Sequence, residues 1–141
     1  MDAIVTAGGI PQADEPLYAY TQGASKALLE IAGKPMIQWV LDALGAAQQV
    51  ERVVIMGLDA GSGVNCDKPL SFMPNQGSML QNMLGGIARV LELNPAARQA
   101  LIVSSDIPGI TPAMVDWVVE TCQQTDEDVY YHVITRQTME G

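Results

Sequence analysis

Three short segments of the sequence hold residue types that could bind phosphate and a metal ion. The first is Ala7-Gly8-Gly9, which follows the apolar run 3–6 and is accompanied downstream by Lys26. Glycines that follow a strand let the backbone approach a phosphate closely and aim its N–H groups at it. A glycine pair can equally form an ordinary turn, so this segment alone leaves both interpretations open.

The second segment, Ser105-Asp106-Ile107-Pro108, comes directly after another apolar run. In open α/β sheets, ligands bind beyond the carboxyl ends of the strands, where Asp106 would lie. Mg²⁺ prefers carboxylate oxygens and is commonly held by few carboxylates together with substrate phosphates. Asp106 is therefore a candidate Mg²⁺ ligand, and a simple turn-forming role for its carboxylate is the alternative.

The third segment, Asn75-Gln76-Gly77-Ser78, leads to Asn82. Its amides, its hydroxyl and a helix N-terminus could contact the edge of a base or a ribose. The alternative is that Ser78 only caps the helix while the amides face solvent. Two common phosphate motifs are absent, since neither G-x-G-x-x-G nor G-x-x-x-x-G-K-[ST] occurs.

These segments lie between alternating strands and helices. Short apolar runs predict buried strands at 3–6, 53–56, 70–73, 101–103 and 129–134. Helical spacing of apolar residues predicts helices that start at Pro35, after the cap Ser78, and at Pro112 after the cap Thr111. In the second helix, the predicted apolar stripe consists of Met79, Leu80, Met83, Leu84, Ile87, Val90 and Leu91. The alternation predicts an α/β fold with a mainly parallel sheet covered on both faces.

Composition narrows the classes of partner. The 141 residues are 48% hydrophobic and carry a formal net charge of −9, which repels nucleic acid and anionic lipid. We find no secretory signal and no apolar run long enough to span a membrane, so we expect a cytoplasmic protein without nucleic-acid or membrane partners. Cys66 and Cys122 lack metal or redox spacing and are expected to be reduced, and His132 is expected to be structural. An anionic ligand would need backbone amides, a few lysines and a divalent cation.

Taken together, Ala7-Gly8-Gly9, Lys26 and the stretch Gly33-Lys34-Pro35-Met36-Ile37 resemble the N-terminal signature of the NTP-transferase superfamily, and above all its MobA-like branch. The 75–82 segment resembles the base-contacting loop of that family. The 105–108 segment resembles its metal-aspartate loop. The resemblance covers nearly the whole chain in the right order.

The resemblance implies a Rossmann-like, three-layer α/β/α sandwich of the glycosyltransferase-A type. It also implies a Mg²⁺-dependent nucleotidyltransferase that moves an NMP group from an NTP to a small phosphorylated acceptor, such as a sugar phosphate or molybdopterin, and releases pyrophosphate. Lys26 and Asp106 would be catalytic, with Asp106 holding Mg²⁺. The nucleotide would be bound by Ala7, Gly8, Gly9, Asn75, Gly77 and Ser78.

The sequence also departs from that family. No arginine follows the glycines in a G-x-x-x-R pattern, and the loop carries Asp14 and Glu15. Residues 1–141 are expected to form an incomplete, N-terminal portion of the nucleotide-binding domain. Two alternatives stay open: a non-catalytic nucleotide-sensing module, and a glycosyltransferase using a nucleotide-sugar, although Ser104 replaces the first acid of its Asp-x-Asp motif. The base, the acceptor and the oligomeric state are not specified.

Overall fold

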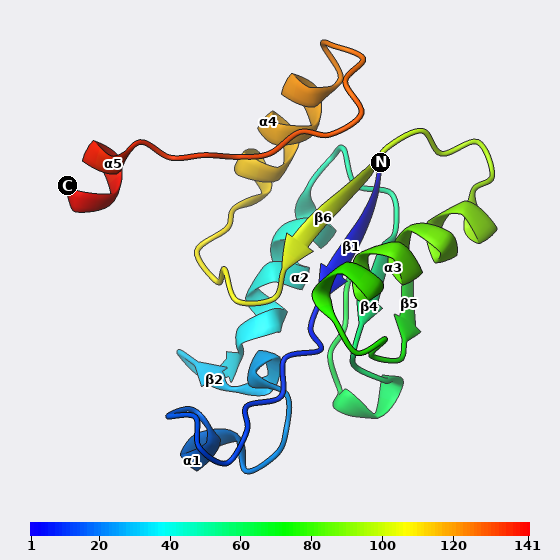
Figure 1. Cartoon of the computed structure of the whole chain (residues 1–141). Coiled ribbons are helices and arrows are strands. Elements are labelled where there is room, and N and C mark those ends of the chain that lie inside the picture. The colour runs from blue at the N-terminus through cyan, green and yellow to red at the C-terminus, as the bar shows by residue number, and fades with distance from the viewer.

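The centre of the protein is a four-stranded parallel sheet, described here from a computed structural model of residues 1–141. Its strands are β1 (Asp2–Thr6), β4 (Val53–Met56), β5 (Leu70–Met73) and β6 (Ala100–Ser104). They lie in the order β5-β4-β1-β6, and every pairing is parallel (Figure 1). The strand order reverses at β1, because β4 and β5 lie on one side of it and β6 on the other. Ligands of open α/β sheets bind at such a reversal, beyond the carboxyl ends of the strands.

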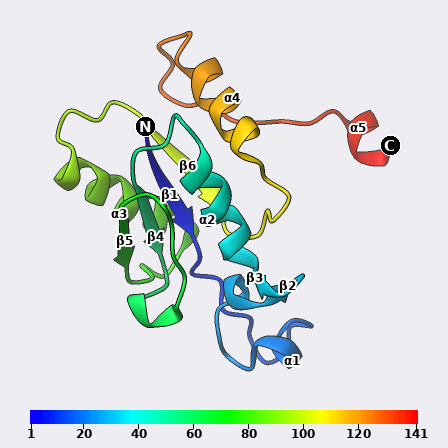
Figure 2. The ribbon, with the colours of Figure 1, turned by 180° about the vertical axis from the view of Figure 1, so that it is seen from behind.

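Helices cover both faces of this sheet. Helix α3 (Met79–Leu93) lies on the face nearer the viewer in Figure 1, while α2 (Met36–Ala46) and α4 (Pro112–Cys122) lie on the other face, seen in Figure 2. The larger core cluster lies between the sheet and helices α2 and α4, and it includes Val5, Ile55 and Leu41. A smaller cluster beneath α3 contains Ile4, Val54, Met56 and Val90. The expected three-layer α/β/α architecture is therefore confirmed.

The helix starts follow the signals in the sequence, with one shift. Ser78 Oγ accepts a hydrogen bond from Gln81 N, and Thr111 Oγ1 accepts one from Met114 N. Helix α2, however, begins at Met36 rather than at Pro35. Pro35 belongs instead to β3 (Lys34–Pro35), which pairs with β2 (Glu30–Ile31) in a small antiparallel hairpin.

The long segment between β1 and β2 includes two short helical stretches. It contains the short helix α1 (Tyr18–Thr21) and a single 3₁₀ turn, η1 (Lys26–Leu28). A second 3₁₀ turn, η2 (Ala60–Ser62), follows β4. None of the helices combines the length and the apolar character that crossing a membrane requires.

The predicted apolar stripe of α3 is not the face that packs on the sheet. The buried residues of α3 are Asn82, Gly86 and Val90, whereas most of the predicted stripe is exposed. Gly86 explains this orientation, because a Cβ at that position would lie 2.4 Å from Cγ2 of the buried Ile4. The missing side chain lets the helix approach β1 closely, and the apolar stripe turns outward as a result.

The prediction of a fifth strand at 129–134 is wrong. This segment pairs with no strand and runs along and away from α4 toward α5 (Arg136–Glu140), as Figure 1 shows. The side chains of Val129 and Tyr131 are among its exposed ones. His132 stacks on Trp117 with ring centroids 6.0 Å apart. The apolar, β-branched composition is typical of a strand, but no neighbouring backbone is in reach to form a ladder with it.

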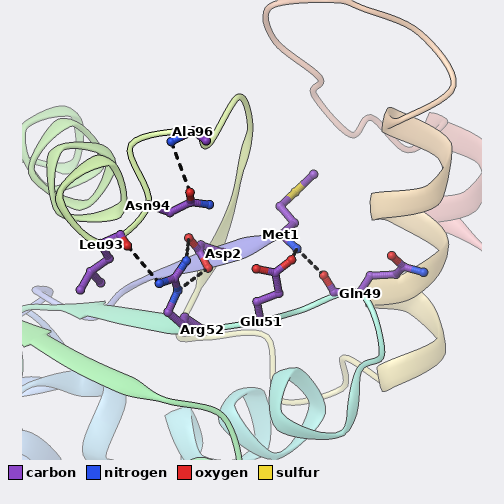
Figure 3. A network of polar contacts seen from close by, with 8 residues as sticks. All are labelled: Met1, Asp2, Gln49, Glu51, Arg52, Leu93, Asn94 and Ala96. Carbon is purple, nitrogen blue, oxygen red and sulfur yellow. Dashed lines mark hydrogen bonds and ion pairs between the residues drawn. The ribbon is translucent and has the colours of Figure 1, made fainter.

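A polar network closes the sheet at the amino end of β1, the end opposite the candidate site (Figure 3). The buried carboxylate of Asp2 accepts hydrogen bonds from Arg52 Nε and Nη2 at 3.0 and 3.2 Å. Arg52 Nη1 also donates to Leu93 O, and the amino group of Met1 donates to Gln49 O at 2.6 Å. These contacts fix the start of β1 and the end of α3, so they serve the fold rather than the site.

Candidate functional site

The segment after β1 is held by three other parts of the chain. Ser25 Oγ donates to Ala7 O at 2.8 Å, Asn75 Nδ2 donates to Gly8 O at 3.1 Å, and Lys26 N donates to Gly9 O at 2.9 Å. Three successive carbonyl groups of residues 7–9, which we call the glycine bend, are therefore fixed by donors from distant segments.

Fixing these carbonyls also orients the amides that follow them. In a trans peptide the C=O and N–H groups point in opposite directions, so each held carbonyl aims the next N–H away from its partner. The N–H groups of Gly8, Gly9 and Ile10 donate no hydrogen bond within the chain. Backbone amides presented in this way suit an anionic ligand such as a phosphate.

Neighbouring side chains fill the space beside both glycines of the bend. A Cβ on Gly8 would lie 2.9 Å from Asn75 Cγ, and a Cβ on Gly9 would lie 2.9 Å from Lys26 Cε. A larger residue at Gly8 would therefore disturb Asn75, whose side chain holds the bend, and one at Gly9 would displace the flexible end of Lys26.

The structure brings Lys26 and Asp106 together beside the bend. Lys26 Nζ lies 2.8 Å from Asp106 Oδ2, and Ser104 Oγ donates to the other carboxylate oxygen. The hydrogen bond from Lys26, followed by the one from Ser104, holds the pKa of Asp106 below its usual value. The carboxylate is thus anionic at neutral pH, with one oxygen hydrogen-bonded to Lys26 and the other to Ser104.

Local structure places each of these two groups. Ser25 is buried, and its hydroxyl accepts from Ala27 N while it donates to Ala7 O, which positions the start of η1 and with it Lys26. Asp106 follows β6, and Ser105 N donates to Thr6 O at 3.2 Å, which continues the pairing of β6 with β1 past the strand end. Both groups are therefore anchored to the end of β1.

The 75–78 segment lies on the other side of the bend. Asn75 contacts Gly8 directly, and Gly77 adopts a φ of +100° that favours glycine. Ser78 caps α3 and is exposed. The amide of Asn75 is used within the chain, since its oxygen also accepts from Gly77 N and Asn82 Nδ2. Of the three candidates, Asn75 is the one that meets the glycine bend.

Two cavities are lined by residues that contact the bend, although residues 7–9 themselves line neither of them. One, of about 590 Å³, is lined by Ser25 and Asn75 and by residues at the carboxyl ends of β4 and β5. Its wall includes Gly57, Asp59 and Ser62, which no sequence motif singled out. These residues follow β4, and this position in the sequence could have identified them, because parallel strands end at a common edge of the sheet. The other cavity, of about 400 Å³, is lined by Lys26, Asp106 and mainly apolar residues.

The chemistry of the donor set suits a hard cation held only in part by protein. No group of three or more His, Cys, Asp or Glu side chains is placed to enclose a metal ion. Asp106 instead offers one carboxylate near Gly8 and Gly9 of the bend, whose backbone N–H groups donate no hydrogen bond within the chain. Mg²⁺ is often bound by one or two carboxylates plus substrate phosphates and water, so these residues fit that mode of binding.

The comparison with known proteins agrees with this geometry. The sequence profile of the MobA-like NTP transferase domain matches residues 3–140. The chain belongs to this family. It is 26% identical over 104 residues to a probable molybdenum cofactor guanylyltransferase of Thermococcus kodakarensis, a match that covers 72% of the chain and 48% of the relative.

Two further members of the wider group are similar. A 3-deoxy-manno-octulosonate cytidylyltransferase of Marinobacter nauticus is 33% identical over 114 residues, which cover 78% of the chain and 42% of the relative. A solved hypothetical transferase of Thermus thermophilus superposes with a TM-score of 0.64 and 32% identity, over 85% of the chain and 46% of that structure. The chain thus spans about half the length of the curated relatives it matches.

Proposed function

We propose that this MobA-like NTP transferase chain binds an NTP with Mg²⁺ and takes part in the transfer of its NMP group to a small phosphorylated acceptor. The observation that carries the proposal is the convergence of the glycine bend, Lys26 and Asp106 at the point where the strand order reverses. An anionic phosphate chain and its cation need donors and a carboxylate. The free backbone N–H groups of Gly8 and Gly9, the ammonium group of Lys26 and the carboxylate of Asp106 supply them.

The residues of the chain would divide the work in a simple way. The amides of Gly8 and Gly9 would hold phosphate oxygens, and Lys26 would move its ammonium group from Asp106 to the phosphate, where negative charge develops during transfer. Asp106 would hold Mg²⁺, which supplies charge neutralisation when bound. An acceptor phosphate oxygen is already anionic and needs no strong general base, so catalysis is mainly positioning and electrostatics.

The base and the acceptor are matters for experiment. The relatives include a guanylyltransferase and a cytidylyltransferase by name, so both GTP and CTP belong in the first panel. The cavity of about 590 Å³ beside Asn75 is the place where we propose that the base and ribose lie. The apolar wall of the other cavity, next to Lys26 and Asp106, suits a part of a substrate that is not charged.

The test combines titration calorimetry with the four NTPs and Mg²⁺ and a pyrophosphate-release assay, both on the natural full-length protein. Asp106→Ala should abolish pyrophosphate release. Lys26→Ala should lower kcat/KM, because it removes about 2–4 kcal/mol of transition-state stabilisation. Asp126→Ala and Lys68→Ala are matched controls, because Asp126 is exposed and pairs only with Arg98, and Lys68 forms no ion pair.

Each outcome decides between the proposal and a rival. Unchanged turnover in Asp106→Ala would refute the role of that carboxylate, and a loss below tenfold in Lys26→Ala would refute the role of the lysine. Nucleotide binding without pyrophosphate release would favour a sensing module. Release of a nucleoside diphosphate from a nucleotide-sugar would instead identify a glycosyltransferase.

A further inference from the structure

A buried polar side chain on α3 connects to the glycine bend through one intermediate. Asn82 lies in the first turn of α3 and is 5% exposed. Its Nδ2 donates to Asn75 Oδ1 at 3.0 Å, and its Oδ1 accepts from Gln76 N at 2.7 Å. Both polar atoms of the amide are thus used to hold the 75–76 segment, and the side chain faces the sheet rather than solvent.

Asn75 carries this restraint onward to the bend. Its Nδ2 donates to Gly8 O at 3.1 Å, so the peptide between Gly8 and Gly9 is held from the side of α3. The fit is close, because a Cβ on Gly8 would lie 2.9 Å from Asn75 Cγ and 3.0 Å from Asn82 Nδ2. The orientation of the Gly9 N–H group therefore depends on two amide side chains in series.

We propose that Asn82 is a positioning residue for phosphate binding: through Asn75 it holds the Gly8–Gly9 peptide so that the Gly9 amide faces the anion. This inference rests on the proposed function, since it concerns the same phosphate-binding bend. Asn82 does not read the base itself, because its amide is buried and already paired. Its effect on the phosphate contacts is measured with a ligand that carries no base.

The first experiment needs no ligand. In ¹⁵N–¹H NMR spectra of the chain, Asn82→Leu should shift or broaden the Gly8 and Gly9 amide signals, because the leucine cannot hold Asn75. The matched control is Asn94→Leu, the same change at the other end of α3, where the side chain only accepts a hydrogen bond from Ala96 N. That control should leave both glycine signals in place.

The second experiment measures binding of inorganic pyrophosphate with Mg²⁺ by titration calorimetry. Asn82→Leu should weaken the affinity about tenfold, the size expected when a buried hydrogen-bonded group loses its partner. Asn94→Leu should change it less than about twofold, because its lost bond lies outside the site. GTP and CTP should be weakened at least as much as pyrophosphate, since Asn82 also holds Asn75, which lines the cavity proposed for the base and ribose.

A double-mutant cycle distinguishes positioning from general loss of structure. If Asn82 acts through Asn75, then Asn82→Leu should add less than about twofold when Asn75→Ala is already present. Asn82→Asp is a second variant in case the leucine variant does not fold. It retains an acceptor for Gln76 N but lacks the donor to Asn75, so it should also move the glycine signals.

The results separate this inference from the proposed function. Unmoved Gly8 and Gly9 signals in every Asn82 variant that folds, or effects of Asn75 and Asn82 that multiply independently, would overturn the positioning role. Absence of nucleotide and pyrophosphate binding by the unmodified chain would overturn the proposed function and this role with it. If the chain binds neither ligand but the glycine signals still move in the Asn82 variants, only the contact from Asn82 through Asn75 to Gly8 is supported.

Discussion

Gly57 offers a sharp test of how closely the strand ends approach one another. Gly57 follows β4 with a φ of +103°, a conformation that residues with a Cβ rarely adopt. A Cβ there would lie 2.5 Å from Gly8 Cα and 2.6 Å from Gly8 N. The obstructing atoms are backbone atoms of the glycine bend, so no side-chain rotation relieves the clash in Gly57→Ala.

The magnitude follows from a comparison with Gly63, which has a φ of +77° and no atom within 4 Å of the position that a Cβ would take. Both alanine variants carry a left-handed backbone cost of about 1–2 kcal/mol. Both also gain about 0.4–1 kcal/mol by restricting the unfolded chain. Only Gly57→Ala adds overpacking, which costs about 1–3 kcal/mol in a tightly packed region. Its free energy of unfolding should therefore fall below that of Gly63→Ala by about that amount.

Urea denaturation followed by circular dichroism measures this difference. For slopes of about 1–3 kcal/mol/M, the midpoint of Gly57→Ala should lie about 1 M below that of Gly63→Ala. Gly57→Ala should also weaken pyrophosphate binding, since the bend must move to accommodate the methyl group. Equal midpoints for the two variants would show that the end of β4 does not press on the bend, and the argument for a rigid bend would fail.

Three further predictions concern other contacts. Lys26→Met should raise the pKa of Asp106 toward its ordinary value, which carboxyl NMR measures. That pKa is lowered in the folded protein, so the ion pair stabilises the fold at pH values above the unfolded pKa of about 3.9. This stabilisation is lost as the pH falls through the lowered pKa. Arg52→Leu should lower the free energy of unfolding by about 3–5 kcal/mol in urea, since it leaves the buried Asp2 carboxylate unpaired; a change under 1 kcal/mol contradicts this. Thr111→Ala should cost about 1 kcal/mol by removing the cap of α4, and an unchanged thermal midpoint would argue against the cap.

Much of the fold could be predicted because its signals are local. The four strands of the sheet are short apolar runs, and Ser78 and Thr111 cap the helices that follow them as their positions indicate. The alternation of strands and helices then favours a parallel sheet with helices on both faces. Nothing beyond neighbouring residues was needed for these predictions.

The errors arose where tertiary contacts outweigh composition. The apolar spacing in α3 indicated one packing face, but Gly86 lets a different face, which shares only Val90 among its buried residues with the predicted stripe, approach Ile4. The segment 129–134 has the composition of a strand, yet a strand forms only beside another backbone. In both cases the deciding factor was a distant partner that apolar periodicity does not reveal.

The candidate site was predicted in its parts rather than in its connections. Sequence patterns singled out the glycine bend, Lys26, Asn75 and Asp106, and the structure places these residues together. The supporting hydroxyl of Ser25 was not predicted, because a serine in a loop has no distinguishing pattern. Its role becomes visible only when its contacts with the backbone of β1 and η1 are known.

The way the glycine bend is held also bears on how the protein folds. The contacts to its carbonyls join residues separated by 18 and 67 positions, and the neighbouring ion pair joins residues 80 positions apart. Long-range contacts of this kind form late and slow the folding rate of a domain. Competence to capture an anion should therefore emerge in a single kinetic phase with completion of the sheet, and no short peptide cut from around the diglycine should show it.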